Sequence, residues 1–208
     1  MAIAHGGDAE WDLELSRGTP RQGGGCQVKA LIVVDVQNGV YQWEGSEVFA
    51  GQRTITTINE LITRCRAGNN PVIFVQHEDE YLAPGSAPWE LLSALDVRGD
   101  DALVSKRHGS AFQGTRLDES LRAAGIGRVV VCGMQTELCV DSTCRHALAL
   151  GYDVELAADA HTTFDTAVLS ASQIVDHHNS TLRNYCDVRP ADSIEFESRG
   201  ICAAPPLE

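Results

Sequence analysis

The chain has 208 residues, with 16 basic and 29 acidic side chains and a formal net charge of −13. This length suits one compact domain with a flexible end. The negative charge argues against a nucleic-acid partner, because a phosphate backbone attracts Lys and Arg side chains.

The two ends of the chain differ in composition from its middle. Residues 1–27 are rich in glycine and have little apolar periodicity, so they bury too little surface to offset the entropy of ordering them. We therefore predict a flexible N-terminal arm at 1–27, with an ordered contact between subunits as the alternative. Residues 28–200 form the predicted domain, and residues 201–208, which include "AAPPLE", form a C-terminal tail.

Short β-branched apolar runs alternate with helix-like segments across the predicted domain. Strands that are apolar on both faces and separated by helices are typical of a parallel sheet covered on both sides. The sequence therefore predicts an α/β fold of three layers around a central, mostly parallel six-stranded sheet. The predicted strands lie at 29–35, 70–76, 101–106, 128–133, 153–160 and 184–190, and the predicted helices at 50–67, 115–124, 137–150 and 166–183.

Three chemically reactive side chains follow predicted strands. Asp35 ends the first strand, Lys106 ends the third, and Cys139 opens the helix after "RVVVCG". In parallel sheets the ligand cleft lies beyond the carboxyl ends of the strands, so these side chains are expected to meet at one edge. An acid, a cation and a thiol together can form an activated nucleophile with its base and an electrostatic support.

The position of Cys139 predicts a reactive thiol. If Thr136 caps the helix, Cys139 lies in its first turn, where free N–H groups and the helix dipole stabilise a thiolate and lower its pKa. The same N–H groups can bind the oxyanion of a tetrahedral intermediate. The alternative for any cysteine is inert core packing, and it is the interpretation adopted here for Cys65, Cys132 and Cys144.

The sequence resembles the isochorismatase-like cysteine hydrolases over about residues 28–190. The resemblance rests on "ALIVVDVQNGV", "SKRHGSAFQGTRLD" and "VVVCGMQTELCVDSTCRHALALGYDVELAADAHTTFD". It implies a catalytic triad of Asp35, Lys106 and Cys139, a cis peptide between Met134 and Gln135, and an oxyanion hole formed by the amides of Gln135 and Cys139. It also implies a homo-oligomer, a dimer or a tetramer.

One departure from the wider superfamily bears on metal binding. Its metal-dependent nicotinamidases carry an Asp-x-His pattern after the second strand, where this chain has "VQHEDEYLAPGSAPWELL". Neither order nor spacing fits, so no metal is predicted, although His77 and the acidic residues at 78–80 remain an alternative oxygen-rich site. The pair "HH" at 177–178 does not match an i, i+4 ligand pair, and no G-x-G-x-x-G follows the first strand. No cofactor is predicted.

The segment after the second strand is the predicted substrate loop. Trp89 offers an apolar face, and Glu90 offers a carboxylate that can pair with a cation; a packed loop with a core tryptophan is the alternative. The full set of expected substrate contacts is Gln37, His77, Trp89, Glu90 and Met134.

Cysteine usage and hydropathy indicate the compartment. Seven cysteines, an odd number without the spacing of a disulfide scaffold or zinc site, suggest a reduced protein. The sequence also lacks an apolar stretch of roughly 18 residues and a recognisable signal peptide. We expect a cytoplasmic protein without a membrane partner.

These observations predict a metal-independent cysteine hydrolase that cleaves a C–N bond in a small-molecule amide or lactam. Within the family, "VQHED", "PGSAPWE" and "DHHNSTL" most resemble the streptothricin hydrolase type, which opens a lactam in a cationic antibiotic, and the acidic composition would suit such a substrate. The first alternative is an isochorismatase that cleaves a vinyl ether without needing a cysteine. The second is a noncatalytic or redox-sensing protein that uses Cys139, with Cys132 or Cys144, as sensor thiols.

Overall fold

The computed structural model describes residues 28–42, 46 and 48–197. The predicted N-terminal arm at 1–27 and C-terminal tail at 201–208 lie outside the described residues. Within the described part of the chain, no helix is long and apolar enough to cross a membrane.

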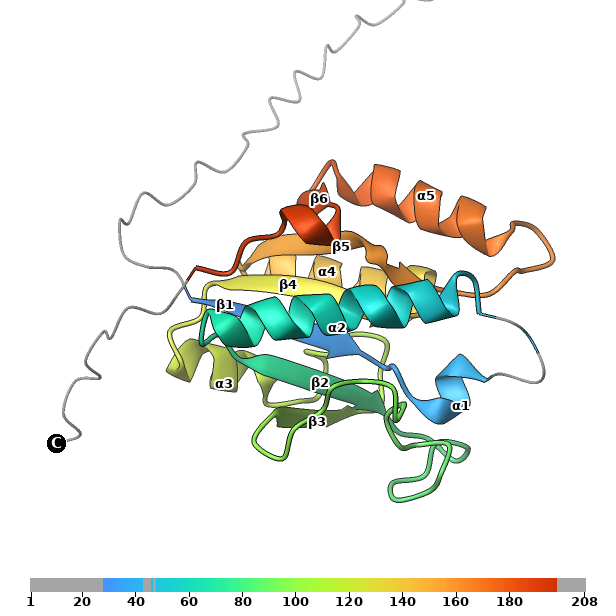
Figure 1. The fold of residues 1–208 in the computed structure, drawn as a ribbon, viewed down its shortest axis with the longest axis horizontal. Helices are drawn as coiled ribbons and strands as arrows, with labels where there is room; N and C mark the ends of the chain where they lie inside the picture. Colours follow the sequence, from blue (N-terminus) through green and yellow to red (C-terminus); the bar gives the residue numbers. More distant parts are fainter. Residues whose placement is uncertain (1–27, 43–45, 47, 198–208) are drawn as a thin grey trace, which may run out of the picture.

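A six-stranded parallel sheet forms the centre of the molecule (Figure 1). Its strand order is β3-β2-β1-β4-β5-β6, and every pairing between neighbours is parallel. The predicted α/β fold class is therefore confirmed. The strands are β1 (Lys29–Val34), β2 (Val72–His77), β3 (Ala102–Lys106), β4 (Arg128–Met134), β5 (Asp153–Thr162) and β6 (Asp187–Arg189).

Two apolar cores cover the two faces of the sheet. The helix α2 (Gly51–Ala67) packs with Leu31 and Val33 on one face and lies in front of the sheet in Figure 1. On the opposite face, Ala30, Ile32 and Val34 pack with the remaining long helices. These are α3 (Leu117–Ala123), α4 (Asp141–Ala149) and α5 (Ala171–Leu182). Alternate residues of β1 thus point into different cores, which explains why its sequence is apolar throughout.

The register of the sheet brings several strand ends to one edge. Val34 pairs with Val75 on one side and with Gly133 on the other, and His77 pairs with Lys106. The side chains that follow β1, β3 and β4 therefore meet beyond the same edge, as expected for a parallel sheet.

Two short helical turns follow strands at this edge. The helix α1 (Asn38–Tyr41) follows β1, and the π-helix η1 (Thr136–Val140) follows β4. The 3-10 helix η2 (Ala191–Ser193) follows β6 and lies away from this edge, where the carbonyl of Ala191 accepts a hydrogen bond from Arg64 near the end of α2. The helix expected at 137–150 is therefore divided into η1 and α4.

The helix expected at 166–183 begins only at Ala171. Ser170 caps α5 in a capping box with Gln173, and Asp165 Oδ1 accepts a hydrogen bond from the amide of Ala171. Thr166 Oγ1 binds the amides of Val168 and Leu169. These polar side chains satisfy local backbone groups outside a helix, so residues 163–170 form a loop.

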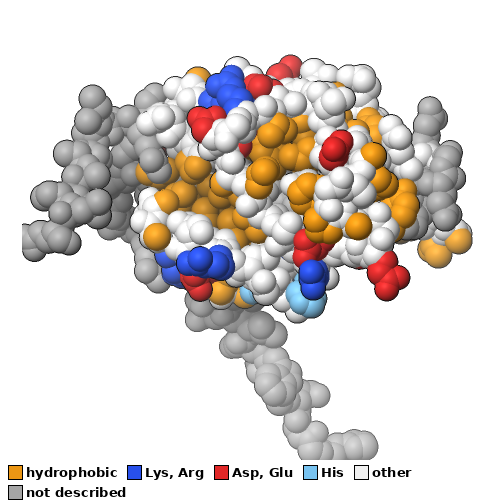
Figure 2. All heavy atoms as spheres, turned by 90° about the horizontal axis from the view of Figure 1, so that it is seen from below, with side chains coloured by type: hydrophobic (Ala, Val, Ile, Leu, Met, Phe, Trp, Pro, Cys, Tyr) orange, Lys and Arg blue, Asp and Glu red, His pale blue; other side chains and the backbone are white. Residues whose placement is uncertain are grey.

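The strand β3 lies at one edge of the sheet and exposes part of its surface. Leu103 is 59% exposed, in contrast to the buried side chains of β1. Seen from below, where Figure 1 places β3, hydrophobic side chains cover much of the molecule, with charged side chains mainly near the margins (Figure 2).

Candidate active site

Asp35 and Lys106 form a buried ion pair beyond the sheet edge. Asp35 directly follows β1 with a left-handed φ of 49°, and Lys106 is the last residue of β3. The distance between Lys106 Nζ and Asp35 Oδ2 is 2.6 Å, and the two side chains are 0% and 2% exposed. Charged side chains are stable at such depth only when they are paired.

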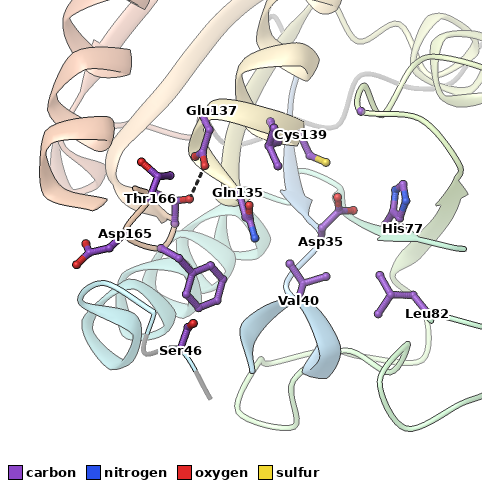
Figure 3. Close-up of a pocket in the computed structure, with 14 residues that line it drawn as sticks. Asp35, Val40, Ser46, His77, Leu82, Gln135, Glu137, Cys139, Asp165 and Thr166 are labelled. Atoms are coloured by element: carbon purple, nitrogen blue, oxygen red, sulfur yellow. Dashed lines mark hydrogen bonds between the residues drawn. The ribbon is translucent and has the colours of Figure 1, made fainter. Parts of the chain in front are cut away.

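Cys139 lies beside this ion pair. It lies in η1 and is half-buried, with its Sγ 3.3 Å from Lys106 Nζ. The structure therefore brings Asp35, Lys106 and Cys139 together around one ammonium group, and Figure 3 shows Cys139 and Asp35 on the same side of the pocket.

Burial dominates the ionisation of the two acidic groups. It raises the pKa of Cys139 to about 12, assisted by the negative charge of Asp35 and opposed by Lys106. Burial also raises the pKa of Asp35, again opposed by Lys106. The prediction that the helix terminus lowers the pKa of Cys139 was wrong, because desolvation of the thiolate outweighs the stabilisation offered by the turn and the lysine.

The end of β4, just before η1, lies very close to the backbone of β1. Gly133 has a φ of +116°, and a Cβ at this position would lie 2.1 Å from the carbonyl oxygen of Val34. Any larger residue would push β4 away from β1. The next peptide bond, between Met134 and Gln135, is cis.

A buried histidine supports the start of η1. The predicted cap, Thr136, does not cap the helix; Gln135 occupies that position without a side-chain cap hydrogen bond. Instead, Thr136 Oγ1 lies 2.9 Å from His161 Nδ1, and His161 Nε2 lies 3.0 Å from Asn179 Oδ1. Burial lowers the pKa of His161 to about 4, so its ring is neutral at neutral pH. The helix that carries Cys139 is thus tied to β5 and α5.

His77 is the fourth polar group beside the lysine. Its Nδ1 lies 3.2 Å from Lys106 Nζ, and burial followed by the positive charge of Lys106 lowers its pKa. Because an ammonium only donates hydrogen bonds, Nδ1 of the neutral ring is the acceptor. Lys106 therefore donates toward Asp35, His77 and Cys139.

A cavity of about 750 Å³ opens in front of these residues. Asp35, His77 and Cys139 line one end, and Glu137, Asp165 and Thr166 lie toward the other (Figure 3). The volume is within the range of sites that hold small molecules. Gln135 lies between the two ends, so both residues predicted to supply the oxyanion hole line the cavity.

Four expected substrate contacts do not line this cavity. Gln37 is fully buried. Its Oε1 accepts a hydrogen bond from the amide of His77, and its Nε2 donates to the carbonyls of His77 and Trp89. Its amide is therefore occupied in bracing the loop after β2. Met134 is 1% exposed and packs in the core beneath α2.

The predicted substrate loop has a similar structural role. Trp89 is half-buried and its carbonyl accepts hydrogen bonds from Gln37 and Gln76, while the side chain of Glu90 is exposed. Neither side chain lines the cavity. The alternative of a packed loop fits these contacts better than a substrate-binding loop.

Two of the acidic residues after β2 have partners close by. Glu78 pairs with Arg107 at 2.6 Å, and Asp79 Oδ1 accepts hydrogen bonds from the amides of Tyr81 and Leu82. Within residues 28–42, 46 and 48–197, no group of three or more His, Cys, Asp or Glu side chains is arranged to hold a metal ion.

Glu137 is a pocket residue that was not expected from the sequence. It lies in η1 two positions before Cys139, and both residues line the cavity. Its position two residues before the predicted nucleophile was visible in the sequence. A regular helix was expected there, however, and that expectation did not place the side chain of Glu137 in the pocket.

Comparison with known proteins identifies relatives that match most of the chain. Residues 29–180 match the family model described as "Isochorismatase domain". The chain is 36% identical over 142 residues to a streptothricin hydrolase of Streptomyces noursei, a match that covers 66% of this chain and 56% of that protein. It is 33% identical over 169 residues to a ureidoacrylate amidohydrolase of Stutzerimonas stutzeri, covering 63% of this chain and 68% of that protein. The chain thus spans little more than half the length of the streptothricin hydrolase.

Solved structures show the same architecture. A crystal structure of an isochorismatase family protein superposes with a TM-score of 0.76 and 31% identity, covering 79% of this chain and 99% of that chain. A cysteine hydrolase from Pseudomonas syringae pv. phaseolicola 1448A gives a TM-score of 0.75 with 25% identity, covering 79% and 89% of the two chains.

Proposed function

Because the chain belongs to the isochorismatase domain family, we propose that it is a cysteine hydrolase that cleaves a C–N bond in a small-molecule amide or lactam. The observation that carries this proposal is the cluster of Asp35, Lys106 and Cys139 at one end of the cavity. The streptothricin hydrolase and the amidohydrolase among its relatives support this bond type.

In the proposed acylation, Asp35 is the general base. Its Oδ1 is buried and has no hydrogen-bond partner among the described residues, so this oxygen is available to take a proton from Cys139. The raised pKa of the thiol indicates that the resting enzyme holds a neutral thiol, and that the proton leaves as Sγ attacks the substrate carbonyl. The raised pKa of Asp35 favours its holding that proton briefly.

Collapse of the tetrahedral intermediate then releases the amine. Asp35 returns its proton to the leaving nitrogen as the C–N bond breaks, and the acyl group remains on Sγ as a thioester. In the second half of the reaction, Asp35 takes a proton from water, the resulting hydroxide attacks the thioester, and Sγ leaves with the proton. In this proposal the amides of Gln135 and Cys139 bind the developing oxyanion in both halves.

Lys106 has an electrostatic role in this scheme. Its ammonium lies 2.6 Å from Asp35 Oδ2 and 3.3 Å from Cys139 Sγ, so it can stabilise whichever group carries the negative charge. A preorganised cation in a water-poor site lowers the barrier without moving.

We further propose that no metal or cofactor takes part. His77 Nδ1 faces the Lys106 ammonium, and Glu78 is paired with Arg107. A metal bound to His77 Nδ1 would meet a cation 3.2 Å from the ligand nitrogen. We also propose a homo-oligomeric enzyme that acts in the reducing cytoplasm, where the free thiols of residues such as Cys65 and Cys139 persist.

The test is Cys139-dependent turnover. Purified wild type and Cys139→Ser are incubated with amides, cyclic amides and a vinyl ether, and products are followed by mass spectrometry. We expect hydrolysis of an amide or lactam by wild type only, with a thioester adduct on the Cys139 peptide after rapid acid quenching. Hydrolysis of the vinyl ether alone, or equal turnover by Cys139→Ser, would favour the isochorismatase alternative. Absence of any turnover together with reversible oxidation of Cys139 would favour the sensor.

A further inference from the structure

The cavity holds a second carboxylate that the proposed reaction does not use. Glu137 Oε1 accepts a hydrogen bond from Thr163 Oγ1 at 2.9 Å, and the dashed line in Figure 3 marks this contact. Glu137 Oε2 is buried and has no hydrogen-bond partner among the described residues. A buried carboxylate oxygen without a partner is costly, so this atom favours a donor or a cation beside it.

No competing Lys or Arg lines the described part of the cavity wall. The described residues that line the cavity include the carboxylates of Asp35, Glu137 and Asp165 but no Lys or Arg side chain. Asp35 is paired with Lys106, and Asp165 Oδ1 accepts a hydrogen bond from the amide of Ala171. Asp35 Oδ1 also lacks a hydrogen-bond partner among the described residues, but the proposed reaction uses this oxygen as the base. Glu137 Oε2 is therefore the unpaired carboxylate oxygen of the pocket that the reaction leaves without a role.

We propose that Glu137 is a specificity-determining residue that binds an ammonium or guanidinium group of the substrate while Cys139 attacks its carbonyl. Both side chains project from the five-residue helix η1, Glu137 toward Thr166 and Cys139 toward Asp35 (Figure 3). The spacing between the cation site and the nucleophile is thus set within one short helix. As a statement about substrate class, this inference rests on the proposed hydrolase function.

The inference assigns charge selection to a different residue from the one that the sequence suggested. Glu90 is exposed and lies outside the cavity, whereas Glu137 lines it. A cationic substrate bound to Glu137 would also lie in a pocket with Phe164, which is 9% exposed. Low exposure weakens the competition from water and strengthens the charged contact.

Thiol modification tests this proposal without a known substrate. Cys139 is treated with two methanethiosulfonates that differ only in the group on the ethyl chain, which is ammonium in one and hydroxyl in the other. In each reaction the thiolate attacks the sulfenyl sulfur, a mixed disulfide forms and methanesulfinate leaves. Peptide mass spectrometry reports the rate at Cys139 alone, separately from the other cysteines.

The readout is the ratio of the ammonium rate to the hydroxyl rate. This ratio cancels any change in the ionisation of Cys139, because both reagents attack the same thiol. In Glu137→Gln we expect it to fall about tenfold, the effect of losing one partly buried charged contact, while the hydroxyl rate is retained. The glutamine keeps an oxygen that can accept from Thr163, so the pocket is preserved.

Glu60→Gln is the matched control. Glu60 is an exposed residue of α2, so this variant removes the same unit of charge from outside the cavity. We expect its ratio to change by less than about twofold, because salt screens exposed charges. Equal ratios in wild type and Glu137→Gln would overturn the inference, as would a fall of the same size in Glu60→Gln.

A substrate pair separates this inference from the proposed function. For any amide that the wild type hydrolyses, an ammonium-bearing and a hydroxyl-bearing analogue are compared. We expect Glu137→Gln to lower kcat/KM about tenfold for the cationic analogue, mainly through KM, and to spare the neutral one. Hydrolysis without this selectivity would overturn the inference alone. Absence of hydrolysis with the thiol-reagent selectivity intact would contradict only the proposed function.

Discussion

The Lys106 ammonium lies 2.6 Å from the Asp35 carboxylate and 3.3 Å from Cys139 Sγ. One cation therefore contacts both groups between which the proposed mechanism moves a proton. Lys106 therefore has a structural role as well as a chemical one, because its removal leaves the buried carboxylate of Asp35 unpaired.

Substitution of Lys106 should affect stability and activity separately. Lys106→Met should lower the free energy of unfolding by about 3–5 kcal/mol, because Asp35 becomes an unpaired buried charge. The double variant Asp35→Asn/Lys106→Met should recover most of this loss but remain inactive. Urea denaturation and turnover check the two effects. If the double variant were no more stable than Lys106→Met, the unpaired charge would not be the cause.

Lys106→Arg should be only partly tolerated, since a planar guanidinium cannot replace a compact ammonium.

Asp35→Asn should leave the fold intact and reduce kcat by about 10²–10⁴, the usual contribution of a general acid or base. An amide side chain keeps the shape of the carboxylate but cannot accept the thiol proton. Circular dichroism checks the fold, and steady-state kinetics on an identified amide checks the rate. A variant that kept nearly the wild-type kcat would show that another group activates Cys139.

The sequence was sufficient to predict the sheet, because β1 and β4 are apolar on both faces and are punctuated by helical segments. It was also sufficient to place Asp35, Lys106 and Cys139 at one edge, since the carboxyl ends of parallel strands lie on the same side of the sheet. These conclusions depend on the apolar periodicity of each segment and on the alternation of strands and helices along the chain, which can be read from the sequence.

The pocket walls depended on contacts that local patterns do not contain. Gln37 looked available for substrate, but its amide binds the backbone of His77 and the carbonyl of Trp89, which are distant in sequence. Glu137 looked like an ordinary helical residue, but η1 directs it into the cavity. The pKa of Cys139 depended on burial, which a helix-terminus argument omits.

The ionisation of Cys139 should be visible in its reaction with iodoacetamide. Because its pKa is raised to about 12, the thiolate fraction and hence the alkylation rate should rise about tenfold per pH unit from pH 7 to 9. Modification should abolish turnover in proportion to labelling of the Cys139 peptide. A rate that levels off below pH 8 would instead indicate a lowered pKa. Equal inactivation through Cys65, with Cys139 unlabelled, would contradict the assignment of the nucleophile.

Removal of metal ions should leave turnover unchanged. Near the proposed nucleophile, His77 Nδ1 is directed at Lys106, so the ring nitrogen nearest the site is already occupied. Dialysis against a strong chelator, followed by elemental analysis and kinetics, checks this expectation. Loss of activity that zinc or iron restores would show that residues 77–80 bind a catalytic metal.

His161 should make the enzyme less stable in mild acid. The histidine accepts a hydrogen bond from Thr136 and donates one to Asn179, and burial lowers its pKa from 6.5 to about 4. Between these values the unfolded chain binds a proton that the folded chain excludes, so stability is lost as the pH falls. From pH 7 to 5 the loss from this group should be about 2 kcal/mol.

The comparison of wild type with His161→Gln isolates this contribution from other titrating groups. Asp35, whose pKa is raised by burial, changes stability in the opposite direction, and the nearby charges of His178 and Asp159 are present in both proteins. Urea denaturation at pH 5 and 7 should therefore show about 2 kcal/mol less loss in His161→Gln than in wild type. Because Thr136 begins the helix that carries Cys139, the variant should also lose kcat at neutral pH. Identical pH dependence in the two proteins would mean that His161 is already protonated, or exposed to water, in the folded enzyme.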